Sequence, residues 1–214
     1  MNDYIGDNIK VVLFDHDDTL VGTFSPKSKL HKLVARTYYG KELSDEEIIA
    51  NWGKPLPELV GILYGTIDAD KALENNAKHH TDFPKELFEP TIPVLRHIKS
   101  NGKKIGIITA TSRFSFEHDL DLHNIPRELI DYTQAAEDSQ FHKPDKRVFD
   151  PVLAWLGKEG VHPEEVIYIG DGLHDMEAAL GAGFNFLGVE TGLVTHEGFE
   201  SVGATSIPDT SHLL

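Results

Sequence analysis

The sequence predicts an α/β fold: a doubly wound, Rossmann-like parallel sheet with an all-helical domain inserted into it. Three observations lead to this prediction. Short apolar, β-branched runs recur along the chain, as expected of strands that helices cover on both faces. Helical patterns separate these runs after residue 90, which is typical of right-handed crossover connections. Residues 24–86 contain helical patterns and no convincing strand.

The first strand is expected from Ile9 to Phe14, where an almost wholly apolar run ends abruptly in acidic residues. Runs of the same kind predict further strands at 104–108, 165–169 and 185–189, and a weaker one at 130–135. Helices are expected between these strands, at 90–100, 113–123, 146–158 and 174–182.

The segment between the first two strands predicts a cap domain made of helices. Ser44 precedes three acidic residues, which is typical of a capped helix start, and Pro55 suits a first helical turn. We therefore expect a catalytic core of residues 1–22 and 87–214 and a cap of residues 23–86. The cap helices are expected at 28–39, 44–51, 55–64 and 68–80.

Length and composition exclude several classes of protein. The chain has 214 residues, which suits one large domain or a core with a modest insert. It has no cysteine, which excludes disulfides, a thiolate zinc site and a cysteine nucleophile. Its formal charge is −15, whereas binding to nucleic acid or to an anionic membrane needs clustered lysine and arginine. We therefore expect neither of these partners.

The beginning of the chain carries no visible targeting signal. Residues 1–8 are acidic, whereas a signal peptide has a basic stretch followed by a longer apolar one. The apolar run that follows is far shorter than the ~20 residues that span a bilayer. We therefore expect a cytoplasmic protein.

Acids, hydroxyls and one lysine follow the expected strands. Ligands of open α/β sheets bind outside the carboxyl ends of the strands, so these side chains should gather at one edge. The motif Asp-x-Asp occurs three times in this acidic chain, and only Asp15/Asp17 directly follows a buried strand. The residues expected at this edge are Asp15, Asp17, Thr109, Ala110, Lys143, Asp171 and Asp175.

This set of residues predicts a bound cation. Two carboxylates about 4 Å apart repel by about 4 kcal/mol at an effective dielectric constant near 20. A divalent cation and an ammonium group relieve that repulsion, and an all-oxygen donor set suits magnesium. His16 lies between Asp15 and Asp17, and strand alternation predicts that its side chain points away from them.

Four segments resemble, in order, the motifs of the haloacid dehalogenase-like superfamily. They are Phe-Asp-His-Asp-Asp-Thr-Leu at 14–20, Thr-Ala-Thr-Ser at 109–112, Lys-Pro at 143–144 and Gly-Asp-Gly-Leu-His-Asp at 170–175. The helical insert is similar to that of the small-cap branch, which includes phosphoglycolate phosphatases and β-phosphoglucomutases. Three departures from the family pattern are Asp18 for glycine, Gly22-Thr23 for Asp-Ser, and Ala110 for asparagine.

The resemblance implies a role for each motif residue. Asp15 would attack phosphorus to form an aspartyl-phosphate, and Asp17 would protonate the leaving oxygen and then activate water. Asp17 also favours phosphoester over carbon–halogen chemistry, since displacing a halide needs no acid. The phosphoryl group would be bound by Thr109, the amide of Ala110 and Lys143. Magnesium would be held by Asp15, the carbonyl of Asp17 and Asp171, with Asp175 ligating it or orienting its ligands.

The resemblance implies a magnesium-dependent phosphatase for a small phosphorylated metabolite, similar to phosphoglycolate phosphatases. One alternative is a phosphomutase of the β-phosphoglucomutase type, and another is a phosphoacceptor signalling module that is not an enzyme. In the cap, Lys54 precedes a helix start, and we hypothesise that it meets a second anionic group of the substrate; a solvated lysine is the alternative. The protein is expected to be a monomer or a homodimer.

Overall fold

The computed structural model describes residues 4–214, except for the side chain of His80. The chain forms two compact units. The core unit contains the chain up to Gly22 and from Leu87 onward, and the helical unit is Thr23–Glu86. Within the described range, no helix has both the length and the apolar character that crossing a membrane requires.

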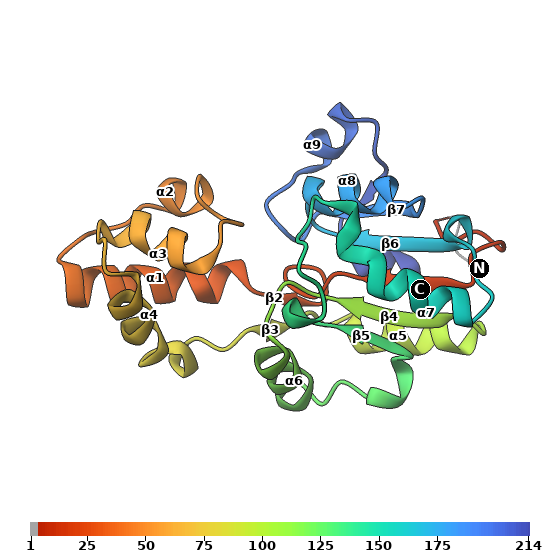
Figure 1. The fold of residues 1–214 in the computed structure, drawn as a ribbon, viewed down its shortest axis with the longest axis horizontal. Coiled ribbons are helices and arrows are strands. Elements are labelled where there is room, and N and C mark those ends of the chain that lie inside the picture. The colour runs from red at the N-terminus through yellow and green to blue at the C-terminus, as the bar shows by residue number, and fades with distance from the viewer. Residues whose placement is uncertain (1–3) are drawn as a thin grey trace. The chain divides into compact units, whose positions relative to one another are not determined.

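The core unit is built on a six-stranded parallel sheet, which confirms the predicted fold class (Figure 1). In spatial order its strands are β5 (Tyr132–Gln134), β4 (Lys104–Ile108), β1 (Val11–Phe14), β6 (Val166–Gly170), β7 (Asn185–Val189) and β8 (Ser206–Ile207). The central strand β1 pairs with both β4 and β6, so that Phe14 lies opposite Ile107 and Ile169. The chain therefore leaves the middle of the sheet at Asp15.

Helices cover both faces of this sheet. Alternate residues of β1 point to opposite faces, so each face has its own buried cluster. Val12 and Phe14 share a buried cluster with residues of α5 (Thr91–Ser100) and α6 (Arg113–Leu122). Val11 and Leu13 share another with residues of α7 (Asp150–Lys158) and α8 (Leu173–Gly181). Phe199 of the short helix α9 (His196–Ser201) packs its ring against Gly188 of β7, where a side chain would leave no room for the ring.

The helical unit has its own buried cluster. It contains α1 (Phe24–Tyr39), α2 (Asp45–Ile49), α3 (Leu56–Tyr64) and α4 (Ala69–Ala77). The expected start of α2 is capped by Ser44, whose hydroxyl accepts from the amide of Glu47 while the Glu47 carboxylate accepts from the amide of Ser44. Apolar residues from all four helices form the core, among them Val34, Ile48, Val60 and Ala72. That this unit acts as a cap over the active site stays a prediction.

Several boundaries differ from those expected. Helix α1 begins at Phe24 rather than at residue 28, with Pro26 in its first turns. The pattern over 146–158 contains a 3-10 turn at Lys146–Phe149, and the α-helix starts only at Asp150, next to Pro151. The sequence also did not predict β8, α9 or the two-stranded sheet of β2 (Val21–Gly22) and β3 (Glu86–Leu87). Two-residue strands are too short to carry an alternating pattern.

Candidate active site

The ammonium group of Lys143 lies where the central strands end. It donates to Asp15 Oδ1 at 2.5 Å, to Asp175 Oδ1 at 2.6 Å and to the hydroxyl of Tyr168 at 2.8 Å. The side chains of Lys143, Asp15 and Asp175 are only 6%, 8% and 0% exposed. An ammonium group has three N–H donors, and here each has an acceptor. The lysine is therefore held in one position.

Different elements bring these acceptors together. Asp15 directly follows β1, and its amide continues the strand pairing by donating to the carbonyl of Ile169 at 2.8 Å. Tyr168 lies within β6, and its hydroxyl donates to the carbonyl of Ile108 at 3.4 Å. Asp175 lies in the first turn of α8, where its Oδ2 accepts from the amide of Gly172 at 3.0 Å. The Asp175 carboxylate therefore both caps α8 and pairs with Lys143.

Three carboxylates converge beside the lysine. Asp15, Asp171 and Asp175 each offer an oxygen, and these oxygens all lie within 4.8 Å of one another. Burial raises the pKa of Asp15 to about 7; Lys143 opposes this rise, whereas the charges of Asp175 and Asp17 add to it. Burial, together with the charges of Asp15 and Asp175, also raises the pKa of Asp171 well above its usual value. Three ionised carboxylates would carry more negative charge than one lysine neutralises, and these raised pKa values reflect that repulsion together with burial.

The same carboxylate charges raise the pKa of the lysine as well, whereas burial acts on it in the opposite direction. Burial lowers the pKa of Lys143, but the charges of Asp15 and Asp175 outweigh burial and hold this pKa well above its usual value. Lys143 is therefore protonated at neutral pH. The remaining excess of carboxylate charge, presented by oxygen donors alone, fits a hard divalent cation, which oxygen ligands bind best.

Asp17 lies beside this cluster and is held by two threonines of the segment after β4. Thr111 Oγ1 donates to Asp17 Oδ2 at 2.7 Å, and Thr109 Oγ1 donates to the same oxygen at 3.2 Å. The Thr109 hydroxyl also accepts from the amide of Thr111 at 3.0 Å. Thr109 was expected to bind a phosphoryl group, and in this structure its hydroxyl contacts Asp17.

His16 points away from the acids on either side of it, as strand alternation predicts. Its ring is fully buried, and Nε2 lies 3.1 Å from Asp119 Oδ2 of α6. Phe116, one turn before Asp119, packs edge-on against the ring with 5.0 Å between the two centroids. The segment that carries Asp15 and Asp17 is thereby attached to α6.

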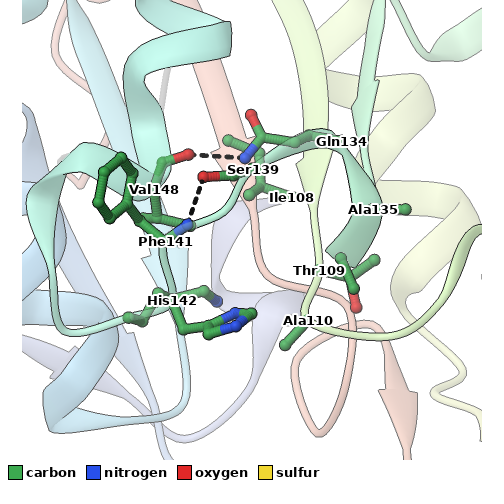
Figure 2. Close-up of a pocket in the computed structure, with 11 residues that line it drawn as sticks. Ile108, Thr109, Ala110, Gln134, Ala135, Ser139, Phe141, His142 and Val148 are labelled. Carbon is green, nitrogen blue, oxygen red and sulfur yellow. Dashed lines mark hydrogen bonds between the residues drawn. The ribbon is translucent and has the colours of Figure 1, made fainter.

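A small pocket adjoins the site (Figure 2). Ala110 and Thr109 line it together with Gln134 at the end of β5 and His142 and Lys143 of the segment before α7. Its volume of about 20 Å³ has room for a water molecule and not for a metabolite. Lys143 connects the pocket to the carboxylate cluster, and the pocket is too small to be the substrate site by itself.

Lys54, the predicted residue of the insert, belongs to the helical unit. Its ammonium group pairs with Glu58 Oε1 at 2.6 Å, one helical turn further on, and both side chains are partly exposed. This contact is that of a solvated lysine near a helix start. A role for Lys54 in substrate binding stays a prediction.

Two residues of the site were given no role in the sequence analysis. Thr111 lies within the second motif, and its β-hydroxyl next to Thr109 was the available signal. Tyr168 lies in a strand that is buried on both faces, where a tyrosine hydroxyl needs a partner. The identity of that partner, Lys143, depends on a segment 25 residues earlier in the chain.

Comparisons with known proteins agree with this architecture. The family model described as haloacid dehalogenase-like hydrolase matches residues 12–189. The PpaX protein of Clostridium perfringens is 33% identical over 189 residues, which cover 85% of this chain and 84% of that protein. Pyrophosphatase PpaX of Bacillus cereus strain AH820 is 30% identical over 184 residues, covering 82% and 80%.

A solved structure from Bacteroides fragilis, of a chain assigned to the haloacid dehalogenase-like hydrolases, has the same fold. Its TM-score is 0.80 at 31% identity, and the match covers 96% of this chain and all of that one. The chain therefore belongs to the haloacid dehalogenase-like hydrolase family and is an enzyme of the phosphoric ester hydrolase class.

Proposed function

We propose that this enzyme is a magnesium-dependent phosphatase that hydrolyses a small phosphorylated metabolite through an aspartyl-phosphate on Asp15. The observation that supports this most strongly is the buried pair of Asp15 and Lys143, with Asp171 and Asp175 beside it. Such a site combines a nucleophile, a positive charge for the phosphoryl group and ligands for a metal.

In the first step, a carboxylate oxygen of Asp15 attacks phosphorus, and the bond from phosphorus to the leaving oxygen breaks. Asp17 gives its proton to that oxygen. The hydroxyls of Thr109 and Thr111 support this role, because both donate to Oδ2 and so fix the orientation of the Asp17 carboxyl group. Lys143 offsets the negative charge on the phosphoryl group.

In the second step, Asp17 takes a proton from water, and the water oxygen attacks phosphorus. The bond between phosphorus and Asp15 breaks, which releases phosphate and restores the Asp15 carboxylate. The covalent route divides one difficult displacement into two easier ones. One group can serve as acid and then as base because it ends the first step ionised.

Magnesium would be held by Asp15, the carbonyl of Asp17 and Asp171, with Asp175 ligating it or orienting its ligands. The donor set supports this assignment, since three carboxylate oxygens within 4.8 Å of one another suit a hard dication. When bound, magnesium supplies positive charge to the phosphoryl oxygens. Asp175 already pairs with Lys143 and caps α8, which favours the orienting role for it.

Two substrates merit the first tests. The name of the Bacillus cereus relative suggests inorganic pyrophosphate, and the resemblance to phosphoglycolate phosphatases suggests phosphoglycolate. Each carries a second anionic group beside the phosphoryl group that is attacked, and Lys54 is our candidate for its recognition. The net charge of −15 supports an enzyme that binds neither nucleic acid nor anionic membranes. A cytoplasmic location and a monomeric or homodimeric state remain part of the proposal.

The experiment is a phosphate-release assay with magnesium over pyrophosphate, phosphoglycolate and a set of sugar phosphates. We expect Asp15→Asn to abolish turnover of every good substrate. Asp70→Asn is the matched control, since Asp70 is an exposed acid of α4 within another Asp-x-Asp. Turnover by Asp15→Asn at the parent rate would contradict the proposal.

A phosphomutase of the β-phosphoglucomutase type is the alternative. It shares the first step, but it then returns the phosphoryl group to a sugar phosphate instead of passing it to water. It is distinguished by adding a hexose bisphosphate to a sugar monophosphate and following isomer formation. Isomer formed faster than free phosphate would favour the phosphomutase.

A further inference from the structure

The segment that follows β7 contacts residues of the candidate metal site. It begins at Glu190, whose amide donates to the carbonyl of Ile207 at 3.0 Å and so continues the pairing with β8. The next two residues, Thr191 and Gly192, contact Asp18 and Asp171 respectively. None of the four family motifs includes this segment.

Gly192 lies so close to Asp171 that no side chain fits between them. A Cβ atom on residue 192 would lie 1.9 Å from Asp171 Oδ2, 2.6 Å from its Cγ and 2.7 Å from its Cβ. Carbon atoms that are not bonded approach to about 3.5 Å. Rotating the carboxylate would not remove the clash, because the Cβ atom of Asp171 is fixed to the backbone. The backbone of one of the two segments would have to move.

This demand is for space and not for an unusual backbone conformation. Gly192 is not among the glycines with positive φ, so a left-handed backbone conformation is not the reason for glycine at this position. We therefore attribute the expected effect of alanine at 192 to the contact with Asp171. This separates Gly192 from Gly53 or Gly65, whose φ angles of +86° and +67° require glycine for another reason.

Thr191 contacts the turn that follows Asp17. Its hydroxyl donates to the carbonyl of Asp18 at 2.5 Å. Asp18 has a φ of +55°, a left-handed conformation that is uncommon for a residue with a side chain and that follows Asp17 directly. Its amide also donates to the carbonyl of Val21 at 2.7 Å. The turn that carries Asp17 is therefore held from both sides.

We propose that Thr191 and Gly192 are positioning residues for the magnesium site. Gly192 sets the place of the Asp171 carboxylate, and Thr191 sets the turn from which the Asp17 carbonyl would reach the same ion. The inference rests on the proposed magnesium dependence. Residues that orient metal ligands typically change metal affinity by about 10–100-fold when they are replaced.

The test measures magnesium binding by calorimetric titration of the substrate-free protein with MgCl₂, so that activity is not the readout. We expect Gly192→Ala to weaken binding at least about tenfold, the lower end of that range. Gly157→Ala is the matched control: Gly157 is an exposed glycine of α7 with no atom within 4 Å of an added Cβ. It should bind magnesium like the parent protein.

A second pair of variants covers the case in which Gly192→Ala does not fold. Thr191→Val removes the donor to Asp18 and should weaken magnesium binding severalfold, whereas Thr191→Ser retains the hydroxyl and should bind like the parent. Magnesium would also rescue a merely unstable protein, because binding stabilises the folded state. Activity that recovers at high magnesium in Gly192→Ala or Thr191→Val therefore supports positioning when urea unfolding without magnesium is unchanged from that of the parent.

The outcomes separate this inference from the proposed function. A parent protein that binds no magnesium overturns both. A parent that binds magnesium, with Gly192→Ala and Thr191→Val binding it equally tightly, overturns the inference and leaves the phosphatase proposal standing.

Discussion

Lys143 and Asp175 are joined by a contact of 2.6 Å between Nζ and Oδ1, although the two side chains come from separate segments. The other oxygen of Asp175 accepts from the amide of Gly172 and caps α8. The position of the lysine is therefore coupled to the start of a helix. This coupling, repeated through Asp15 and Tyr168, makes the site a rigid network and not a collection of loop residues.

Lys143→Met should lower both stability and activity, because it removes the ammonium group that pairs with Asp15 and Asp175 in the cluster of three carboxylates. Breaking a buried ion pair on one side typically costs about 3–5 kcal/mol. We expect the free energy of unfolding, measured in urea without magnesium, to fall by about 3 kcal/mol. The catalytic rate should fall by about 100-fold or more. Lys146→Met, at an exposed position nearby, should change neither quantity.

Tyr168→Phe should reduce activity while keeping the fold. The variant leaves one N–H group of Lys143 without its acceptor, and an unsatisfied buried donor costs about 1–3 kcal/mol. We expect kcat to fall severalfold and the free energy of unfolding to fall by about 1 kcal/mol. Tyr132→Phe is the control, because its hydroxyl contacts Gln134 outside the acid cluster. Equal effects of the two variants on kcat would show that Tyr168 does not act through the lysine.

Thr111→Val should lower kcat and leave KM close to that of the parent enzyme. The hydroxyl of Thr111 lies 2.7 Å from Asp17 Oδ2, and its loss lets the proposed acid turn away from the leaving oxygen. The expected loss is about tenfold, since a positioned acid or base contributes about 100-fold or more. Thr111→Ser retains the hydroxyl and should retain most of the rate. A rise in KM alone would instead indicate a role in substrate binding.

The helical unit should lose stability as the pH falls below neutral, because of His31. Burial, together with the charge of Lys27, lowers the pKa of His31 to about 4. The ring lies 2.7 Å from the hydroxyl of Tyr64, which donates to Asn76 Oδ1. Between the folded pKa of about 4 and the unfolded value of 6.5, only the unfolded chain binds the proton. This contribution is therefore constant above pH 6.5 and declines as the pH falls toward 4.

The size of the effect follows from the pKa difference, and amounts to about 3 kcal/mol between pH 7 and pH 4. It is measured by urea unfolding followed through the fluorescence of Trp52, which packs in this unit, after Trp155 of the core unit is replaced by Phe. His31→Gln retains a donor for Tyr64 and does not titrate, so its pH dependence should be flatter. His118→Gln, at an exposed position of α6, should leave the pH dependence as it is in the parent.

Much of the core unit could be predicted from the sequence because its strands are buried on both faces. The apolar runs that form β1, β4 and β6 are local features. Each strand is followed directly by a residue of the candidate site: Asp15, Thr109 and Asp171 respectively. The short strands β2 and β8 could not be predicted, since two residues carry no periodicity and their pairing depends on neighbours distant in sequence.

The sequence by itself determined the α/β class, the helical insert and the gathering of acids at one edge of the sheet, because residue periodicity and strand order are enough to specify them. Only the tertiary structure decided which partners each side chain has. The three acceptors of Lys143, the two threonines on Asp17 and the approach of Gly192 to Asp171 join segments far apart in the chain. Such contacts depend on the packing of whole elements to within an ångström or so, which no local pattern encodes.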